Sequence, residues 1–262
     1  MRPLSEISPE PLRDLRGVLF DLDDTVLSHG VLTREAYDAI WSLHGAGFVL
    51  VAVTGRPSGW GEVIARQWPV EGAVTENGAV HVVRDGSGVS VDEDGAPDEI
   101  AARKERLASL VRAIARAVPA ARLADDNHAR RSDVAWDIGE RDALDADTIR
   151  ALEREIVSAG ARTTRSSVHL HASFERDDKA SGTVRFLRTR LGEDPGRALG
   201  RFAFVGDSGN DAACFSAFRV TFGVANVRTH VRRLPLPPRW IASRERGAGF
   251  AEIARVLVAA RA

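Results

Sequence analysis

The sequence lacks the features of an exported or membrane-bound protein. Cys214 is the only cysteine among 262 residues, which excludes an internal disulfide framework and a zinc site built on several cysteines. No segment approaches the roughly 20 uncharged apolar residues that a transmembrane helix needs. The first residues carry prolines and charges where a secretory signal would need an apolar run. We therefore expect no membrane partner and a reducing, cytoplasmic location.

An excess of charge of one sign is missing as well. The sequence has 36 Lys and Arg against 37 Asp and Glu, a formal net charge of −1. This balance argues against a nucleic-acid partner, which would call for a basic surface. With 44% hydrophobic and 28% charged residues, the chain is typical of a globular protein of one large domain or two modest ones. Partners must therefore be inferred from individual sites.

Short apolar runs at both ends of the sequence predict a buried parallel sheet. Such runs are too short for helices and lack the alternation of half-exposed strands. The predicted strands lie in GVLFDLD (17–23), FVLVAVTGR (48–56), GAVTENGAVHVV (72–83), RFAFVGD (201–207) and RVTFGV (219–224). Helices are predicted over 34–45, 179–191 and 250–260, and the Asn77-Gly78 pair indicates that one strand ends there and a hairpin begins.

The middle of the sequence follows another pattern. Residues 84–97, rich in Gly, Asp and Ser, are interpreted as a connection. A long helix is predicted over 98–118, a half-exposed strand over 131–138, a second helix over 145–159 and a strand pair over 161–165 and 168–174. We predict an α/β fold in which 1–84 and 176–262 form a Rossmann-like core with a mainly parallel sheet, and 85–175 form an inserted α+β cap after the third strand.

Polar side chains follow three of the predicted buried strands. Asp21 and Asp23 end the first strand, Thr54 ends the second, and Asp207 ends the strand at 201–207. The carboxyl ends of parallel strands meet at one crevice, so these side chains are expected to lie close together. Clustered carboxylates repel one another unless a cation joins them, and a set of oxygen ligands suits Mg²⁺.

These residues resemble the haloacid dehalogenase (HAD) superfamily, whose four motifs appear in order. They are DLDDT (Asp21 to Thr25), the Thr54 of VAVTGR, Lys179 after the cap, and GDSGND (Gly206 to Asp211). The resemblance spans the whole chain. The TENGA stretch (Thr75 to Ala79) resembles subfamily IIB, the Cof-like, sucrose-phosphatase and mannosyl-3-phosphoglycerate phosphatase-like branch. Its members carry a large cap after the third strand, and sugar-phosphate phosphatases are common among them.

The resemblance implies roles for individual residues. Asp21 would attack phosphorus and form an aspartyl-phosphate, and Asp23, two residues on and so on the same side of a strand, would act as general acid and base. Lys179 would offset charge on the phosphoryl oxygens. The Mg²⁺ ligands would be Asp21, Asp207 and the backbone carbonyl of Asp23, supported from behind by Asn210 and Asp211.

The remaining candidates would bind phosphate or the rest of the substrate. Thr54 and the Gly55 amide fit a cradle for phosphate oxygens, whereas Arg56, Asn77 and Asn210 lie beside the same loops. His169 and His171 share one face of a predicted strand and are candidates for substrate contact. An ordinary structural role explains that pair equally well, and the absence of a third ligand argues against a metal site there.

Several other features have ordinary structural explanations. Aspartates after a strand are often turn formers, and Lys179 alone would be a solvated helix start, so only the full set of motifs supports catalysis. Pleat alternation explains Asp133 and Asp137, and Cys214 fits a core position. The cap arginines Arg130, Arg131 and Arg165 are either solvated or substrate-facing, and the proline-rich RRLPLPPRW is either a surface loop or a partner contact.

The sequence thus favours a phosphatase acting on a small phosphorylated metabolite, with a sugar phosphate as the preferred class. A phosphomutase is the first alternative, because the aspartyl-phosphate can return its phosphoryl group to another hydroxyl if the cap excludes water. A phosphorylatable binding module is the second, although a large cap and Asp23 argue against it. The particular substrate, the pathway and the oligomeric state do not follow from the residues.

Overall fold

The computed structural model describes residues 1–141, 143–166 and 168–261. Positions 142 and 167, which fall in the predicted cap, and position 262, which ends the predicted core, lie outside the described residues. Within these ranges no helix is long and apolar enough to cross a bilayer.

Within the described residues the largest sheet has nine strands, ordered β1-β14-β13-β12-β2-β5-β6-β7-β8. Neighbours from β1 to β6 are parallel, whereas β7 and β8 run antiparallel as a hairpin. The predicted α/β class with a mainly parallel sheet is therefore confirmed. The strands are β1 (Arg2–Pro3), β2 (Gly17–Phe20), β5 (Val49–Val53), β6 (Gly72–Thr75), β7 (Val80–Asp85), β8 (Gly88–Glu93), β12 (Phe202–Gly206), β13 (Val220–Gly223) and β14 (Trp240–Ile241).

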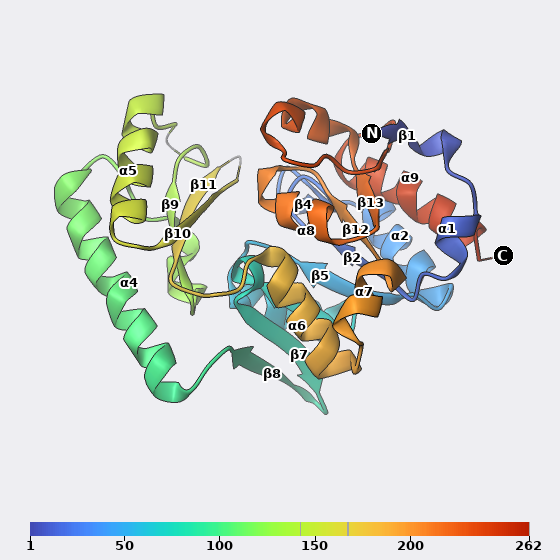
Figure 1. Cartoon of the computed structure of the whole chain (residues 1–262), viewed down its shortest axis with the longest axis horizontal. Coiled ribbons are helices and arrows are strands. Elements are labelled where there is room, and N and C mark those ends of the chain that lie inside the picture. Colours follow the sequence, from blue (N-terminus) through green and yellow to red (C-terminus); the bar gives the residue numbers. More distant parts are fainter. Residues whose placement is uncertain (142, 167, 262) are drawn as a thin grey trace.

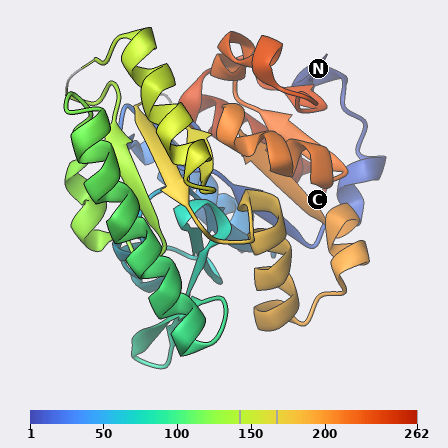
Figure 2. The ribbon, with the colours of Figure 1, turned by 60° about the vertical axis from the view of Figure 1, so that its left-hand side comes forward.

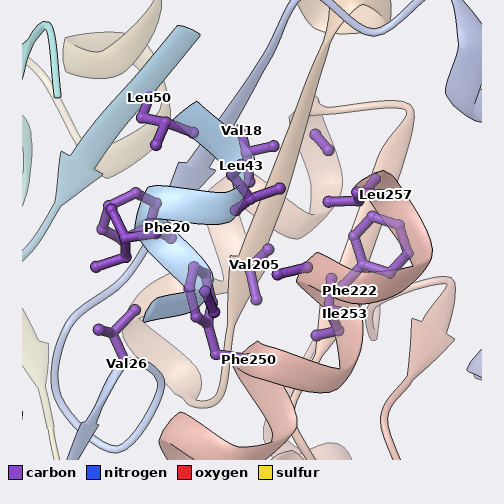
Figure 3. Packing of buried hydrophobic residues seen from close by; sticks show 14 of the residues in the cluster. Val18, Phe20, Val26, Leu43, Leu50, Val205, Phe222, Phe250, Ile253 and Leu257 are labelled. Atoms are coloured by element: carbon purple, nitrogen blue, oxygen red, sulfur yellow. The ribbon is translucent and has the colours of Figure 1, made fainter. Parts of the chain in front are cut away.

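Helices cover both faces of this sheet because its central strands are apolar on both sides (Figure 1). On one face Val18 and Phe20 of β2 pack against α2 and α9, as Figure 3 shows, and on the other Leu19 packs with α6, α7 and α8. Cys214 lies in this second core cluster, as predicted. The helices are α1 (Glu10–Arg13), α2 (Arg34–Gly45), α3 (Ser58–Gln67), α6 (Lys179–Leu191), α7 (Pro195–Arg201), α8 (Ala212–Ala217) and α9 (Arg246–Ala259).

A small hairpin, β3 (Leu27–Ser28) and β4 (Val31–Leu32), follows the first motif and precedes α2. Its turn residues His29 and Gly30 both have positive φ, 52° and 77°. His29 and Gly30 line the same cavity as Asp21 and Asp23, which follow β2.

The middle of the chain forms a second, antiparallel sheet, ordered β10-β11-β9, beside the large one (Figures 1 and 2). One face packs on α4 and α5 through an apolar cluster that includes Leu110, Trp136 and Leu152. Asp145 accepts hydrogen bonds from the first amides of α5, and Gly160 follows that helix with φ +74°. The elements are α4 (Pro97–Ala117), β9 (Asp133–Asp137), α5 (Ala146–Ser158), β10 (Arg162–Arg165) and β11 (His169–Ser173).

Two segments differ from the sequence-based expectations. Residues 84–97, interpreted as a connection, contain strand β8, because Val89 and Val91 pack against the cluster around Val80 and Val82 while the Gly-rich part supplies only the hairpin turn. Strand β9 was expected to be half-exposed but is largely buried. One face of it packs on α4 and α5 and the other faces the large sheet, so neither is free. The division of the chain at 84/85 and 175/176 remains a prediction.

Candidate active site

Three buried carboxylates gather at the carboxyl ends of two neighbouring strands. Asp21 follows β2 and Asp207 follows β12, and these strands pair in parallel with Phe20 beside Val205. Asp211 joins them from the loop after β12, and the three side chains each place an oxygen within 4.8 Å of the others. The expected meeting of strand-end carboxylates is present in the structure.

Lys179 is the cation of this cluster. It is the first residue of α6, and its Nζ lies 2.5 Å from Asp21 Oδ1 and 2.6 Å from Asp211 Oδ1. Burial lowers the pKa of Lys179, but the two carboxylates outweigh that effect and hold it above its ordinary value. The side chain is 2% exposed. Lys179 therefore stays charged and is fixed against the predicted nucleophile.

The cluster carries more negative than positive charge, and a divalent cation would offset the excess. Burial first, and then the charges of Asp211 and Asp23, raise the pKa of Asp21 to about 7 against the pull of Lys179. Burial and neighbouring carboxylates also raise the pKa of Asp207 well above its ordinary value. Neighbouring carboxylates repel one another and therefore favour protonation, unless a cation offsets their charge. A hard divalent ion binds such oxygen donors, so the residues present fit a metal site.

Hydrogen bonds hold Asp207 and Asp211 in place. Asn226 Nδ2 donates to Asp207 Oδ2 at 2.8 Å and to the Asp24 carbonyl at 3.0 Å. Asp211 Oδ2 accepts the backbone N–H groups of Asp207 and Ser208 at 2.9 and 3.2 Å. Asn226 was not among the predicted residues. It follows β13, the next parallel strand, so the rule that located the other strand-end residues also applies to it.

Asp23 lies apart from the metal-type cluster and pairs with Arg56. The Nε of Arg56 lies 2.9 Å from both carboxylate oxygens, and Nη2 lies 2.5 Å from Oδ1. The guanidinium also stacks on Trp60, with its carbon 3.9 Å from the ring centroid. Asp21 and Asp23 nevertheless line the same cavity, although β2 ends at Phe20 and the strand alternation that was expected to place both on one side does not extend to them.

Hydrogen bonds fix the loop after β5, where the sequence predicts a phosphate cradle. Thr54 Oγ1 accepts the Arg56 N–H at 3.0 Å, and the Thr54 carbonyl accepts the Asn77 N–H at 3.1 Å. A Cβ on Gly55 would lie 3.0 Å from Asn77 Oδ1, a tight contact that a larger residue could relieve only by moving the Asn77 side chain. Asn77 Oδ1 is buried and, within the described residues, has no hydrogen-bond partner. An unpaired acceptor at this point suits a ligand hydroxyl or amide.

A polar face of the cap sheet, here called the roof, covers the site. His169 and His171 share that face as predicted, with ring centroids 5.9 Å apart. His171 Nδ1 lies 3.0 Å from Asp133 Oδ2, and His169 Nε2 lies 2.8 Å from Glu140 Oε2. Burial lowers the pKa of His171 despite the neighbouring Asp133, so its ring is neutral at pH 7.

Arg130 and Asp133 form a buried ion pair that the sequence did not predict. The Arg130 side chain is 1% exposed, and its Nη1 lies 2.8 Å from Asp133 Oδ1 and 3.0 Å from the Gly55 carbonyl. Burial raises the pKa of Asp133, but Arg130 and His171 outweigh it and lower that pKa. Asp137, in contrast, is buried and accepts the backbone N–H groups of the following turn, a structural role that replaces the expected pleat alternation.

Two cavities flank the cluster. One of about 520 Å³ is lined by Asp21, Asp23, Arg56, Arg130, His169 and His171. The other, about 560 Å³, lies toward Lys179 and is lined also by Asn77, Arg165 and Asn210. Asn210 lines both and accepts a hydrogen bond from Ser208 Oγ at 2.7 Å. Each cavity has space for a small metabolite.

Comparison with solved structures identifies the fold. A protein of Thermoplasma acidophilum superposes with a TM-score of 0.71 at 17% identity, over 93% of this chain and 98% of that one. A sucrose-phosphatase of Synechocystis, in complex with sucrose and phosphate, gives 0.66 at 18%, over 92% and 98%. A HAD subclass IIB sugar phosphatase gives 0.58 at 14%, over 87% and 93%. No protein-family model and no curated protein matches the sequence.

These likenesses show that the chain has the fold of the HAD-like hydrolases over most of its length. At such low identity they establish the fold alone. The activity must therefore be argued from the residues of the site.

Proposed function

We propose that this chain is a Mg²⁺-dependent phosphatase that hydrolyses a small phosphorylated metabolite, a sugar phosphate, through an aspartyl-phosphate on Asp21. The observation that carries the proposal is the buried contact of Lys179 with Asp21 and Asp211, beside Asp207 and beneath the polar roof. A buried carboxylate held by a cation at an open cavity is a nucleophile with room for its substrate. The subclass IIB fold supports the same reaction.

Mg²⁺ is proposed because the donor groups are all oxygens. The side chains of Asp21 and Asp207 and the backbone carbonyl of Asp23 would hold it, with Asp211 and Asn210 behind them. When bound, the ion offsets the negative charge of the carboxylates and of the phosphoryl oxygens.

In the proposed reaction a carboxylate oxygen of Asp21 attacks phosphorus while the bond from phosphorus to the leaving oxygen breaks. Asp23 gives its proton to that oxygen, and the alcohol departs. Water then attacks phosphorus, Asp23 takes up its proton, and inorganic phosphate leaves as the Asp21 carboxylate is restored. Lys179 stays against Asp21 and offsets charge on the phosphoryl oxygens throughout.

Arg56 holds the Asp23 carboxylate and can also bind the phosphate of a substrate. While the guanidinium holds both oxygens of that carboxylate, the Asp23 side chain is engaged and is not free to contact a leaving oxygen. A phosphate group binds arginine with the same two-pronged geometry and competes for it. We infer that the substrate phosphate draws Arg56 from Asp23, which frees the Asp23 side chain to contact the leaving oxygen.

A sugar phosphate is proposed because the roof presents hydrogen-bonding groups to the cavity of about 520 Å³, where an apolar leaving group would find few partners. His169, Glu140 and Arg141 line this space with both donors and acceptors. A leaving group with several hydroxyls satisfies such a wall.

A panel of phosphorylated metabolites, assayed for inorganic phosphate with Mg²⁺ and with EDTA, tests the proposal. We expect Mg²⁺-dependent release from sugar phosphates, and a loss of at least about a thousandfold in Asp21→Asn because the covalent route is removed. Asp85→Asn, which changes an exposed carboxylate of the same sheet, should keep wild-type activity. Conversion of a sugar phosphate to its isomer without phosphate release would identify a mutase. A phosphorylated protein that never turns over would identify a phosphoacceptor.

A further inference from the structure

The turn that follows β6 is held in an unusual backbone conformation. Glu76, Asn77 and Gly78 have φ values of 50°, 54° and 108°, three consecutive residues in a region that only glycine adopts without strain. Glu76 donates its N–H to the Arg56 carbonyl at 3.0 Å, and Asn77 donates to that of Thr54 at 3.1 Å. The turn is therefore tied directly to the phosphate loop, and surrounding contacts must maintain its shape.

The Glu76 carboxylate binds backbone amides of the cap. Its Oε1 accepts the N–H groups of Ser58 and Arg131, both at 3.0 Å. Its Oε2 accepts those of Arg131, Ser132 and Asp133 at 3.0, 2.6 and 3.2 Å. Three of the four amides belong to the cap, and the carboxylate is buried. Hydrogen bonds to an ionised acceptor are among the strongest in proteins, so Glu76 is the main polar attachment of this cap segment to the core.

The ionised form of Glu76 is the one that these contacts satisfy. Burial first, and then the charge of Asp133, raise the pKa of Glu76 to about 7, although the Ser132 amide and Arg130 oppose this rise. All of the amides are donors, so only the carboxylate without its proton can accept from every one of them. The attachment is therefore complete above pH 7, and pH 8 is the condition for its tests.

The segment attached in this way, residues 129–133, carries part of the roof. Ser58 Oγ donates to the Ala129 carbonyl at 3.1 Å, and Arg130 reaches the Gly55 carbonyl at 3.0 Å. Asp133 in turn contacts both Arg130 and His171. If the segment moves, the roof contacts and the support of the Gly55 loop are lost together.

The other side of the turn contacts the helix of Lys179. Gly182 lies so close to the Gly78 backbone that a side chain at either position would collide with the other segment. Arg185 Nη2 donates to the Gly78 carbonyl at 3.3 Å. A single turn thus meets the cap, the phosphate loop and the start of α6.

We propose that Glu76 is a positioning residue that fixes the cap over the active site and couples this docking to the phosphate loop through Asn77. The proposal deepens the proposed phosphatase function and rests on it for the kinetic effects. Glu76 does not line the cavity beside Asp21, so it acts through the segment that it holds. Glutamine in its place would turn an NH₂ group toward amide donors, which replaces attraction by repulsion.

Hydrogen exchange tests the docking without reference to any activity. In the wild-type full chain with Mg²⁺ at pH 8, the amides of Arg131, Ser132 and Asp133 should be protected. In Glu76→Gln they should exchange about 10–100-fold faster, as expected when hydrogen bonds to a charged group are lost. Glu93→Gln is the matched control, because Glu93 contacts Ser132 only through its hydroxyl, at 3.1 Å, and should leave these amides unchanged.

Kinetics separate positioning from a general loss of structure. For a sugar phosphate that fills the cavity, Glu76→Gln should lower kcat/KM about tenfold or more, mainly through KM, because the roof is no longer fixed. For acetyl phosphate, which is too small to need the roof, the change should stay within about twofold. Equal losses on both substrates, or unchanged exchange at 131–133, would overturn the proposal.

Two other outcomes also decide between the possibilities. If Glu76→Gln does not fold, the absence of protection at these amides in the wild type would by itself refute the docking role. If the wild type hydrolyses no phosphate ester, the proposed function fails, whereas the exchange experiment still decides whether Glu76 holds the cap.

Discussion

Replacing Asp21, the proposed nucleophile, should make this protein more stable at alkaline pH while abolishing the proposed activity. Burial and the nearby carboxylates raise the pKa of Asp21 from 3.8 to about 7. The folded protein therefore binds this proton more tightly than the unfolded chain does. Between pH 4 and 7 the free energy of unfolding should fall as pH rises, by about 1.4 kcal/mol per unit from this group, or at most about 4 kcal/mol in all.

The asparagine side chain cannot ionise, so Asp21→Asn should lack this loss. The gain at pH 8 should be smaller than the full amount, because Lys179 then keeps only Asp211 as a charged partner. We expect the variant to exceed the wild type by about 1–3 kcal/mol at pH 8 and to show no such advantage at pH 4.5. Urea unfolding in EDTA at both pH values measures the two differences.

The test is whether the difference in free energy of unfolding between variant and wild type changes between pH 4.5 and 8. If Asp21→Asn shifts the free energy of unfolding equally at pH 4.5 and 8, the raised pKa of Asp21 is refuted, whatever the sign of the shift. Adding Mg²⁺ at pH 8 supplies a second check. The ion should stabilise the wild type, which binds it with two charged side chains, more than the variant, which has lost one of them.

Two more predictions concern groups around the site. His81 donates from Nε2 to the Gly182 carbonyl, and burial and Arg185 lower its pKa to about 3. The unfolded chain binds the His81 proton more tightly, so His81 should lower the free energy of unfolding by about 1.4 kcal/mol for each pH unit below 6.5. His81→Gln should remove this contribution to the pH dependence of unfolding in acid. An unchanged pH dependence would contradict the lowered pKa of His81. Asn226→Ala removes the hydrogen bond that holds Asp207. It should weaken Mg²⁺ binding about 10–100-fold, measured by calorimetry, and change the stability of the metal-free protein little. An unaltered Mg²⁺ affinity would show that Asp207 does not need this hydrogen bond.

The helices and strands that the sequence predicted well are those whose limits are set by neighbouring residues. Helix α2 begins after Thr33, whose side chain accepts the Ala36 N–H, and α6 begins after Asp178, which accepts two amides. Such capping signals lie within a few positions of the helix start, so both helices span the predicted residues. The strand-end rule worked for the same reason, because parallel pairing brings the carboxyl ends together.

The contacts that the sequence did not predict join distant segments. Glu76 meets amides that lie 55 to 57 positions further along, and nothing near it in sequence marks that partner. Arg130 resembles any cap arginine until the cap docks and its guanidinium reaches the Gly55 carbonyl. Strand β9 looked half-exposed because its outward face consists of polar residues that the core then covers. Each of these depends on how the elements of the small sheet meet those of the large one.

The pairing of β2 with β12 also determines when the site can appear during synthesis. Asp21 leaves the ribosome early, but the strand that brings Asp207 beside it lies more than 180 residues later. At the usual pace of translation roughly ten to thirty seconds separate β5 from β12. During that interval β2 has an open edge, whereas the cap sheet, built from nearby segments, can already form. Unfinished chains therefore carry Asp21 without the carboxylates that complete the proposed site, and we expect them to be inactive.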